Sequence, residues 1–412
     1  MTKKSDAPAI RFKGFSDAWE QRKLEDYLTV SAEKNTGNIY GRSDVLSVSG
    51  DYGIVNQIEF QGRSFAGASV SNYGVVQTGD VVYTKSPLNS NPYGIIKTNK
   101  GKPGIVSTLY AVYHPKENAF SDFIQVYFEQ HARMNNYMHP LVNKGAKNDM
   151  KVSAENALKG PVCFPSRIEQ ESISAFFSVL DNLITLHQRK FEKLTNVKKS
   201  MLEKMFPQNG SSYPEIRFKG FTDPWEQRKL SEITDKVTEK NSGLQYVETF
   251  TNSAEFGIIS QRDFFDHDIA KLGSLDGYYI VKNEDFVYNP RISTSAPVGP
   301  INRNKLGRTG VMSPLYTVFR PHDIDTTYLE YFFKCGYWHS FMNFNGDSGA
   351  RSDRFSIRDN VFFQMPIPIP DIDEQRKIGE LLTCLDNLIT LHQRELEKLQ
   401  NIKKSMLEKM FV

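Results

Sequence analysis

An internal duplication constrains this chain of 412 residues more than any other feature. The segment IRFKGFSDAWEQRKL at residues 10–24 returns at 216–230 as IRFKGFTDPWEQRKL, with 13 of 15 positions identical. A second segment, LDNLITLHQRKFEKLTNVKKSMLEKMF at 180–206, returns at 385–411 with 23 of 27 positions identical. Because self-similarity at a fixed spacing reports a repeated structural unit, we expect two copies of one structural plan.

The middle segments, residues 25–160 and 231–365, match only at scattered positions that stay nearly in register. DVVY at 80–83 corresponds to DFVY at 285–288, and GIVSTLY at 104–110 corresponds to GVMSPLY at 310–316. We therefore expect two modules with one fold and different surfaces. β-branched and aromatic residues between turn residues predict strands, and longer amphipathic stretches predict helices. The predicted strands are 79–83, 109–113, 285–288 and 315–319, and the predicted helices of the modules are about 121–138 and 326–342.

The near-identical segments are predicted to form two long helices. Ser166 with Glu169, and Asp371 with Glu374, have the spacing of a capping box at a helix start. Apolar residues then recur at steps of three and four, which is typical of a coiled-coil seam. The seam residues are Ile173, Phe176, Leu180, Leu183, Phe191, Leu194, Val197, Met201 and Met205, and in the copy Ile378, Leu381, Leu385, Leu388, Leu396, Leu399, Ile402, Met406 and Met410.

Two such helices on one chain can bury their seams by pairing antiparallel, which implies a pseudo-twofold axis. His187 and His392 fall on the seam near the helix middles. They are interpreted as polar residues that set the register, the alternative being a pH-sensitive or metal-binding pair.

The predicted fold class is α+β, with two similar mixed α/β modules separated by two long helices that pair as an antiparallel coiled coil. The predicted boundaries are a first module at 1–164, a first helix at 165–206, a polar linker at 207–214, a second module at 215–369 and a second helix at 370–412.

Composition narrows the class of protein. Hydrophobic residues make up 39% and charged residues 24%, which excludes an intrinsically disordered chain. No apolar run is long enough to span a membrane, and the start lacks a signal peptide, so we expect a cytoplasmic protein without a membrane partner. The three cysteines are too dispersed for a disulfide framework or a thiolate metal site, and we expect no bound metal.

Motifs of common enzymes are missing from the sequence. It has no phosphate-binding loop, no HExxH, no paired CxxC and no GxSxG. The nearest strings to an adenine-methyltransferase tetrapeptide, Asn91-Pro92-Tyr93 and Asn289-Pro290-Arg291, do not match it. Together these absences favour a binding subunit over an enzyme.

Two divergent modules, each followed by a near-constant helix, resemble the specificity subunit of type I restriction-modification systems. The resemblance also rests on a repeated P-x-x-x-E-Q-x-x-I pattern that leads into L-D, at 165–181 and 370–386. It implies that each module is a target recognition domain that reads one half of an asymmetric, bipartite double-stranded DNA site. It further implies that the helices dock two modification (methyltransferase) subunits, joined by restriction (translocase and nuclease) subunits. S-adenosylmethionine, ATP and Mg are then expected on those partners, with no cofactor and no catalysis in this chain.

Candidate DNA-binding residues are chosen in divergent loops, because Arg, Lys, Asn and Ser suit base edges and phosphates. The alternative is that these side chains form an ordinary solvated surface. The candidates are Lys85, Asn89, Lys97, Lys100, Lys102, Lys144, Lys147 and Asn148 in the first module, and Arg291, Ser293, Arg303, Arg308, Arg351, Ser352 and Arg354 in the second.

Repeated residues are interpreted differently, because modules that read different sequences should not share a base-reading residue. Trp19 and Trp225 are therefore expected in the core or at the junction with the helices, not stacked on bases. The lysines near the helix ends are expected to bind phosphate or an acidic partner, or else to be exposed coiled-coil residues. They are Lys198, Lys199 and Lys204 with their copies Lys403, Lys404 and Lys409.

An alternative function is a coiled-coil scaffold whose duplicated modules bind protein partners. The net charge of the second module, −2 against +4 for the first, lends this alternative some support. An enzyme with an unrecognised site is a third hypothesis. Salt-sensitive, sequence-specific DNA binding by the assembled complex separates the first two.

Overall fold

The protein is described by a computed structural model that covers residues 7–85, 91–144, 150–208, 210–265, 272–348 and 353–412, without the side chains of 143, 144, 150, 151, 272, 273 and 348. It divides into two compact units. Unit 1 comprises Met1–Gln188 and Arg394–Val412, and unit 2 comprises Arg189–Gln393. Each unit therefore contains one module and part of each long helix.

The module of unit 1 is built from short strands with three short helices, followed by the first long helix, α4. The elements are β1 (Glu20–Lys23), β2 (Leu28–Val30), β3 (Leu46–Ser49), β4 (Gly53–Asn56), α1 (Gln57–Gln61), β5 (Gly74–Val76), β6 (Val81–Thr84), β7 (Ile96–Thr98), β8 (Gly104–Val106), β9 (Tyr110–Pro115), α2 (Ser121–Glu129), α3 (His131–Met138), β10 (Asn143–Lys144), β11 (Met150–Lys151), β12 (Pro161–Phe164) and α4 (Arg167–Lys204).

The module of unit 2 repeats this order with one additional short helix, α8. The elements are β13 (Glu226–Lys229), β14 (Thr234–Lys236), β15 (Phe250–Ser253), β16 (Gly257–Ser260), α5 (Gln261–Phe265), β17 (Tyr279–Val281), β18 (Phe286–Tyr288), β19 (Ile301–Arg303), β20 (Gly310–Met312), β21 (Thr317–Pro321), α6 (Thr326–Cys335), α7 (Trp338–Asn345), β22 (Asp347–Ser348), β23 (Phe355–Ser356), α8 (Asp359–Phe362), β24 (Pro366–Ile369) and α9 (Ile372–Lys409).

The two modules have the same strand topology. Each has a four-stranded antiparallel sheet, in the order β2-β9-β6-β7 in unit 1 and β14-β21-β18-β19 in unit 2. The two-stranded sheets also correspond. For example, β1-β12 corresponds to β13-β24, and β10-β11 corresponds to β22-β23. The prediction that the divergent modules share an α+β fold is confirmed.

The central strand of each sheet is covered on both faces, which explains its continuous apolar sequence. In β6, Val81 and Tyr83 join the main core of unit 1, whereas Val82 faces a second cluster. In β18, Phe286 and Val287 divide in the same way between two clusters of unit 2. Successive side chains of a strand point to opposite faces, so both faces need apolar residues.

The helical stretches predicted at 121–138 and 326–342 are each broken into two helices. Gln130 has an extended backbone between α2 and α3. Gly336 ends α6 with φ of 77°, a left-handed conformation that glycine adopts without a steric penalty.

The repeated P-x-x-x-E-Q pattern joins each long helix to its module. Glu169 accepts hydrogen bonds of 2.7 Å from both Nε and Nη2 of Arg11. The neighbouring Gln170 accepts from the backbone N–H of Phe120 at 2.9 Å and donates to the carbonyl oxygen of Pro165 at 3.0 Å. The repeated arginine and the repeated Glu-Gln pair are therefore structural residues.

The start of α9 repeats this junction and corrects one expectation. Glu374 accepts from Nε and Nη2 of Arg217 at 2.8 Å, and Gln375 accepts from the N–H of Asp325 at 2.9 Å. Asp371 caps the helix as predicted, accepting from the N–H of Asp373 at 2.9 Å. The glutamates, however, bind arginines and do not complete capping boxes. The spacing of a capping box is present in the sequence, but an arginine distant in sequence donates to each carboxylate.

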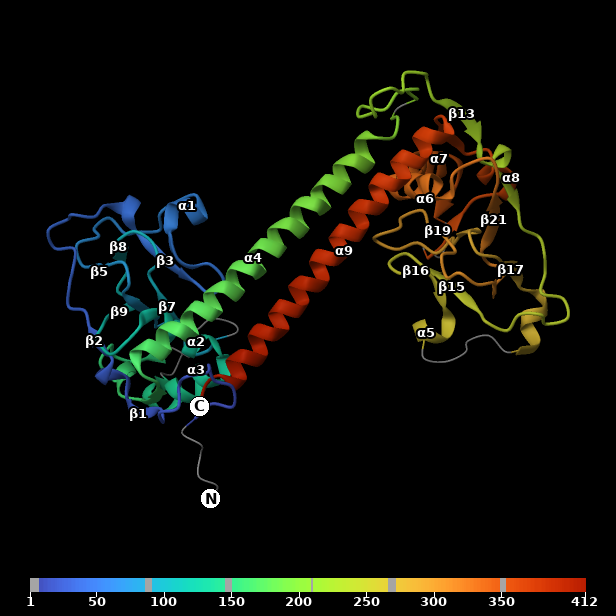
Figure 1. Ribbon diagram of the computed structural model, residues 1–412. Coiled ribbons are helices and arrows are strands. Elements are labelled where there is room, and N and C mark those ends of the chain that lie inside the picture. The colour runs from blue at the N-terminus through green and yellow to red at the C-terminus, as the bar shows by residue number, and fades with distance from the viewer. Residues whose placement is uncertain (1–6, 86–90, 145–149, 209, 266–271, 349–352) are drawn as a thin grey trace. The chain divides into compact units, whose positions relative to one another are not determined.

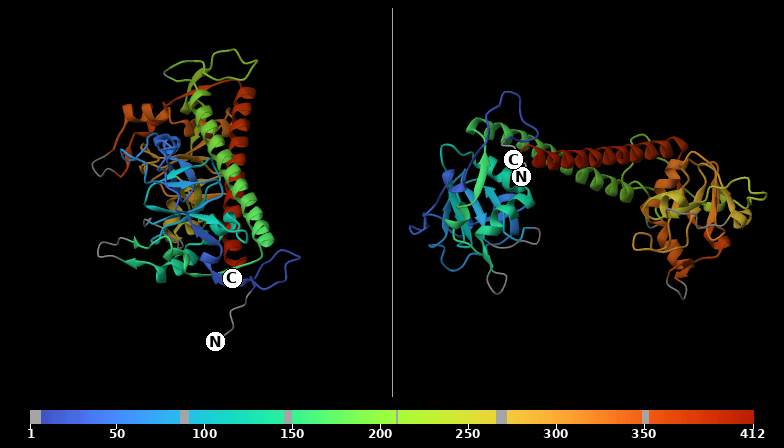
Figure 2. Two further views of the ribbon diagram at one scale, coloured as in Figure 1. Left: turned by 90° about the vertical axis from the view of Figure 1, so that its left-hand side faces the viewer. Right: turned by 90° about the horizontal axis from the view of Figure 1, so that it is seen from below.

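The long helices run antiparallel within each unit. In unit 2, residues near the end of α4 share the core cluster with residues near the start of α9, among them Met201 and Ile378. In unit 1, Phe177 near the start of α4 shares a cluster with Met406 near the end of α9. Figure 1 and both views of Figure 2 show these helix segments side by side. The predicted antiparallel pairing is confirmed.

Ion pairs between the two helices repeat with the duplication. Asp181 of α4 accepts from Lys403 of α9 at 2.7 Å in unit 1. Lys198 of α4 pairs with Asp386 of α9 in unit 2. Lys204 pairs with Glu215 at 2.6 Å. Three of the lysines near the helix ends, Lys198, Lys204 and Lys403, therefore form ion pairs within the chain.

The end of each long helix completes the core of the unit in which it terminates. In unit 1, the ring of Phe411 lies 6.2 Å from that of Trp19 and 5.7 Å from that of Phe123. In unit 2, Phe206 lies 6.4 Å from Trp225. Both tryptophans are buried, so their expected role in the core is confirmed. Each module core is therefore completed by the helix that follows the other module in sequence.

Candidate nucleic-acid interface

Two loops of unit 2 bring together candidate residues that are far apart in sequence. The first loop follows the buried strand β18. Asn289 donates to the carbonyl oxygen of Asn252 at 2.8 Å and accepts from the backbone N–H of Arg291 at 2.9 Å. Ser293 closes the next turn by exchanging backbone hydrogen bonds with Ala296. This first loop is held by its own hydrogen bonds.

The second loop runs into β23 and pairs with the first. The N–H of Phe355 donates to Pro290 at 2.7 Å, and the N–H of Ile292 donates to Asp353 at 3.1 Å. Arg291 and Arg354 form an isolated antiparallel bridge. We call residues 289–296 and 353–357 the paired loops.

Three of the candidate residues project from the paired loops. Arg291, Ser293 and Arg354 all have exposed side chains. Two guanidinium groups and a hydroxyl on adjacent, hydrogen-bonded loops provide donors for phosphate oxygens or for base edges in a major groove. The structure therefore places these three candidates in one surface.

Arg303 lies outside this surface and is engaged in a buried ion-pair cluster. Its guanidinium contacts Glu330 at 2.6 Å and Glu284 at 3.0 Å. Lys305 and Lys334 also contact Glu330, at 2.9 and 2.7 Å. Burial by itself would raise the pKa of Glu330, but the charges and hydrogen bonds of Lys334 and Lys305 outweigh it and lower the pKa to about 2.

Arg308 is also engaged by a carboxylate. Its Nε and Nη2 atoms donate to Glu248 at 2.8 and 2.7 Å. Both Arg303 and Arg308 thus have a structural partner in unit 2, and their contact with DNA stays a prediction.

The candidates of unit 1 also include both ion-paired and exposed residues. Lys97 is 9% exposed and lies 3.6 Å from Glu129. Lys100 pairs with Asp122 at 3.2 Å. Lys102 is exposed in a turn that the Asn99 amide stabilises by donating to the Lys102 carbonyl oxygen. The three residues do not share one structural role, although they are close in sequence.

Lys85 occupies the place in unit 1 that follows the central strand β6. Its N–H donates to the carbonyl oxygen of Leu109 at 3.1 Å. Burial lowers the pKa of Lys85, and the positive charge of Lys34 lowers it further. The negative charge of Glu155 acts in the opposite direction and raises this pKa.

Several candidates cannot be placed. Asn89, Lys147, Asn148, Arg351 and Ser352 lie outside the described residues. Lys144 lies in β10, and only its backbone is described.

Sequence analysis did not select two repeated positions that the structure brings to the same surface. Lys34 and its copy Lys240 occur in the repeated KN[T/S]G segment. Leu109 and its copy Leu315 were assigned to predicted strands, but they lie in turns and are exposed. A stricter search for matches between the modules would have selected the lysines.

The described residues contain no metal-ligand cluster and no membrane-spanning helix. Within the described part of the chain, no group of three or more His, Cys, Asp or Glu could hold a metal ion. No helix in the same residues has both the length and the apolar character required to cross a membrane.

A duplicated fold, with different exposed loops on its modules and near-identical helices, defines the class of protein as a two-module recognition subunit. Comparisons with known proteins name the family. Residues 222–401 match the family described as the type I restriction modification DNA specificity domain.

Two curated proteins of Methanocaldococcus jannaschii are similar to this chain. The putative type I restriction enzyme MjaX specificity subunit is 22% identical over 419 residues, covering 94% of this chain and 92% of the relative. The type I restriction enzyme MjaVIII specificity subunit is 25% identical over 321 residues, covering 74% and 73%. These matches support the prediction from the sequence, which is a specificity subunit of a type I restriction-modification system.

A solved structure supports the fold. The S subunit of a type I restriction-modification system from M. genitalium superposes with a TM-score of 0.54 at 11% identity, covering 98% of this chain and 99% of that one. This likeness concerns the fold alone.

Proposed function

We propose that this chain is the DNA sequence-specificity subunit of a type I restriction-modification complex and that it reads an asymmetric target in two halves. The observation that carries the proposal is the contrast within the duplication. The modules have one topology but different exposed loops, whereas the long helices are almost identical. Different loops suit two different half-sites, and identical helices suit two copies of one partner.

The paired loops support base reading by the module of unit 2. Arg291 and Arg354 are presented from loops whose backbones are hydrogen-bonded to each other. An arginine on such an ordered backbone can make bidentate contacts with guanine without the cost of ordering the loop itself. The segment of unit 1 that corresponds in sequence to the first of these loops contains the candidates Lys85 and Asn89.

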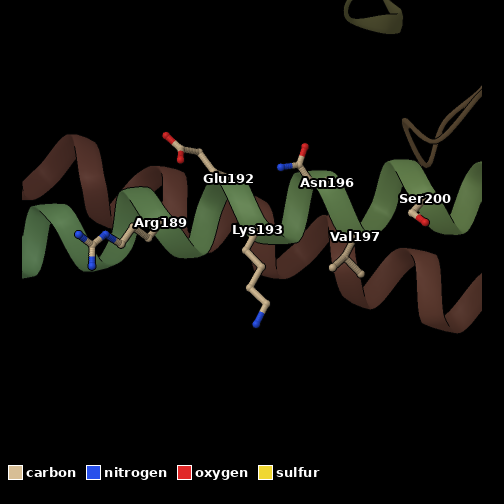
Figure 3. Close-up of a pocket in the computed structure, with 6 residues that line it drawn as sticks. All are labelled: Arg189, Glu192, Lys193, Asn196, Val197 and Ser200. Atoms are coloured by element: carbon tan, nitrogen blue, oxygen red, sulfur yellow. The ribbon is translucent and has the colours of Figure 1, made fainter. Parts of the chain in front are cut away.

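Equivalent surfaces on the helices support docking of two modification subunits. A shallow groove of about 500 Å³ on α4 is lined by Arg189, Glu192, Lys193, Asn196, Val197 and Ser200 (Figure 3). A second groove, of about 550 Å³, lies on α9 at the duplicated positions, from Arg394 to Ser405. Of the six positions, only that of Val197 differs, and it becomes Ile402. We propose that each groove contacts the same surface of one methyltransferase subunit.

Other exposed apolar residues of the same two helices also suit a protein partner. Leu183 and Leu186 of α4 are exposed, and so are their copies Leu388 and Leu391 of α9. Exposed leucines on a long helix favour a protein partner, because burying the remaining exposed part of each would contribute about 1 kcal/mol.

The remaining assignments follow from this function. Catalysis, S-adenosylmethionine, ATP and Mg are assigned to the modification and restriction subunits, and the complex is assigned to the cytoplasm. The chain itself contributes recognition and assembly.

Single-molecule methylation mapping tests the proposal. DNA is compared from cells that express this chain together with its modification subunit and from cells that express the modification subunit alone. We expect an asymmetric two-part motif with modified adenines that depends on this chain. If no methylation depends on it, the scaffold alternative replaces the proposal.

A further inference from the structure

Leu109 and Leu315 are exposed at corresponding positions of the two modules. Leu109 is 62% exposed and Leu315 is 59% exposed. They stand 206 positions apart, in the sequences STLY and SPLY. An exposed leucine gains nothing from burial in its own module. Its presence in both modules therefore calls for a ligand common to both.

Both leucines are carried by the same well-defined turn. The N–H of Tyr110 donates to Ser107 at 3.1 Å, and the N–H of Tyr316 donates to Ser313 at 3.1 Å. Each serine hydroxyl also accepts from the N–H of the leucine at 3.4 Å. A turn that is already ordered presents its apolar tip without the entropic cost of ordering it on binding.

A cationic residue lies close to each tip. The backbone carbonyl oxygen of Leu109 accepts a hydrogen bond from the backbone N–H of Lys85. Leu315 lines a cavity of about 230 Å³ together with Pro290 and Phe355. These two residues directly adjoin Arg291 and Arg354 in the paired loops. An apolar tip within a cationic surface suits a polyanion with an apolar interior, which describes double-stranded DNA.

We propose that Leu109 and Leu315 are apolar wedges that enter the duplex, one at each half-site, and unstack a base step without reading its sequence. The proposal rests on the function proposed above. A residue kept in both modules cannot account for different half-sites, but it can supply a contact that both half-sites need. Leucine is among the side chains that proteins insert between base pairs, and the neighbouring cations would hold the flanking phosphates.

The test uses the full complex of this chain with its modification subunits and duplexes that carry the mapped target. 2-Aminopurine, whose fluorescence rises on unstacking, replaces one base at a time across each half-site. We expect Leu315→Ala to abolish the rise in one half-site only and to weaken binding roughly 5- to 20-fold. Leu109→Ala should act on the other half-site, and Leu315→Met, which keeps an apolar tip, should retain the rise.

Val247→Ala serves as the matched control, because Val247 is an equally exposed apolar residue of unit 2, at 64%, and the corresponding position of unit 1 is Gly41. It should leave the fluorescence unchanged. An unchanged rise in Leu315→Ala would overturn the wedge. Loss of the modification subunit from the Leu315→Ala complex would also overturn it, since Leu315 would then bind protein. Absence of specific DNA binding by the unaltered complex would instead contradict the proposed function.

Discussion

Arg217 and Glu374 form a bidentate ion pair with two hydrogen bonds of 2.8 Å, although 157 positions separate them in the sequence. Glu374 is about 1% exposed. The same pair recurs as Arg11 and Glu169 in unit 1. Each pair joins the repeated segment before a module to the start of the long helix after it.

Replacing one partner of this pair should be costly. We expect Arg217→Met to lower the free energy of unfolding by roughly 3–5 kcal/mol, because it leaves the Glu374 carboxylate buried and unpaired. Denaturant unfolding of the full chain measures the effect. Arg376→Met, which removes an exposed pair with Asp373, should change it by less than about 1 kcal/mol. Equal effects of the two substitutions would refute a structural role for the buried pair.

Because the end of α9 completes the core of unit 1, a substitution there should destabilise unit 1. Phe411→Ala should cost roughly 3–5 kcal/mol, because it leaves a cavity beside Trp19 and Phe123. Hydrogen exchange should show the loss of protection in β1 and α2, with β13 and α6 less affected. Glu408→Ala, at an exposed position of the same helix, is the control. A loss confined to unit 2 would contradict the structure.

Glu330 should make stability depend on acidic pH. Its pKa in the folded protein is about 2, below the ordinary value of 4.5. A lowered pKa means that the stabilisation is present above pH 4.5 and is lost as the pH falls toward 2. Glu330→Gln should therefore destabilise the protein by roughly 2–3 kcal/mol at pH 7 and show a smaller further loss on acidification. Unfolding measured between pH 2 and 7 tests this, with the exposed Glu255→Gln as control.

Arg291 and Arg354 should affect recognition and not stability. We expect each alanine variant to relax the motif in one half-site, with a loss of about 1–3 kcal/mol in specific binding where the arginine reads a base. An arginine that only holds phosphate should weaken binding to all sequences alike and lower the salt slope. Methylation mapping and titrations at several salt concentrations separate these results. Arg228→Ala, in β13 of the same unit, should leave the motif unchanged.

Exchange of a whole module should change half of the target. Replacing residues 25–160 with the corresponding segment of another specificity subunit leaves the repeated junction and both long helices intact. We expect one half-site to change and the other to persist in methylation mapping. A change in both halves would show that the modules do not read DNA independently.

Much of the fold could be predicted from local patterns. The repeat, the seam spacing and the alternation around β6 and β18 depend on residues near one another in sequence, and they correctly predicted two similar modules and two antiparallel helices. Candidate residues were harder to assign. Lys97, Arg303 and Arg308 look like surface cations in sequence, yet each meets a carboxylate supplied by a distant segment.

The sequence by itself determined the duplication, the helix periodicity and the family, because these are properties of order and spacing along the chain. Only the tertiary structure decided that Glu374 binds Arg217, that Phe411 completes the core beside Trp19, and that Leu315 stands exposed. The reason is physical. Burial and ion pairing depend on which distant segments pack together. A side chain of one type can therefore be buried in the core at one position and exposed to solvent at another.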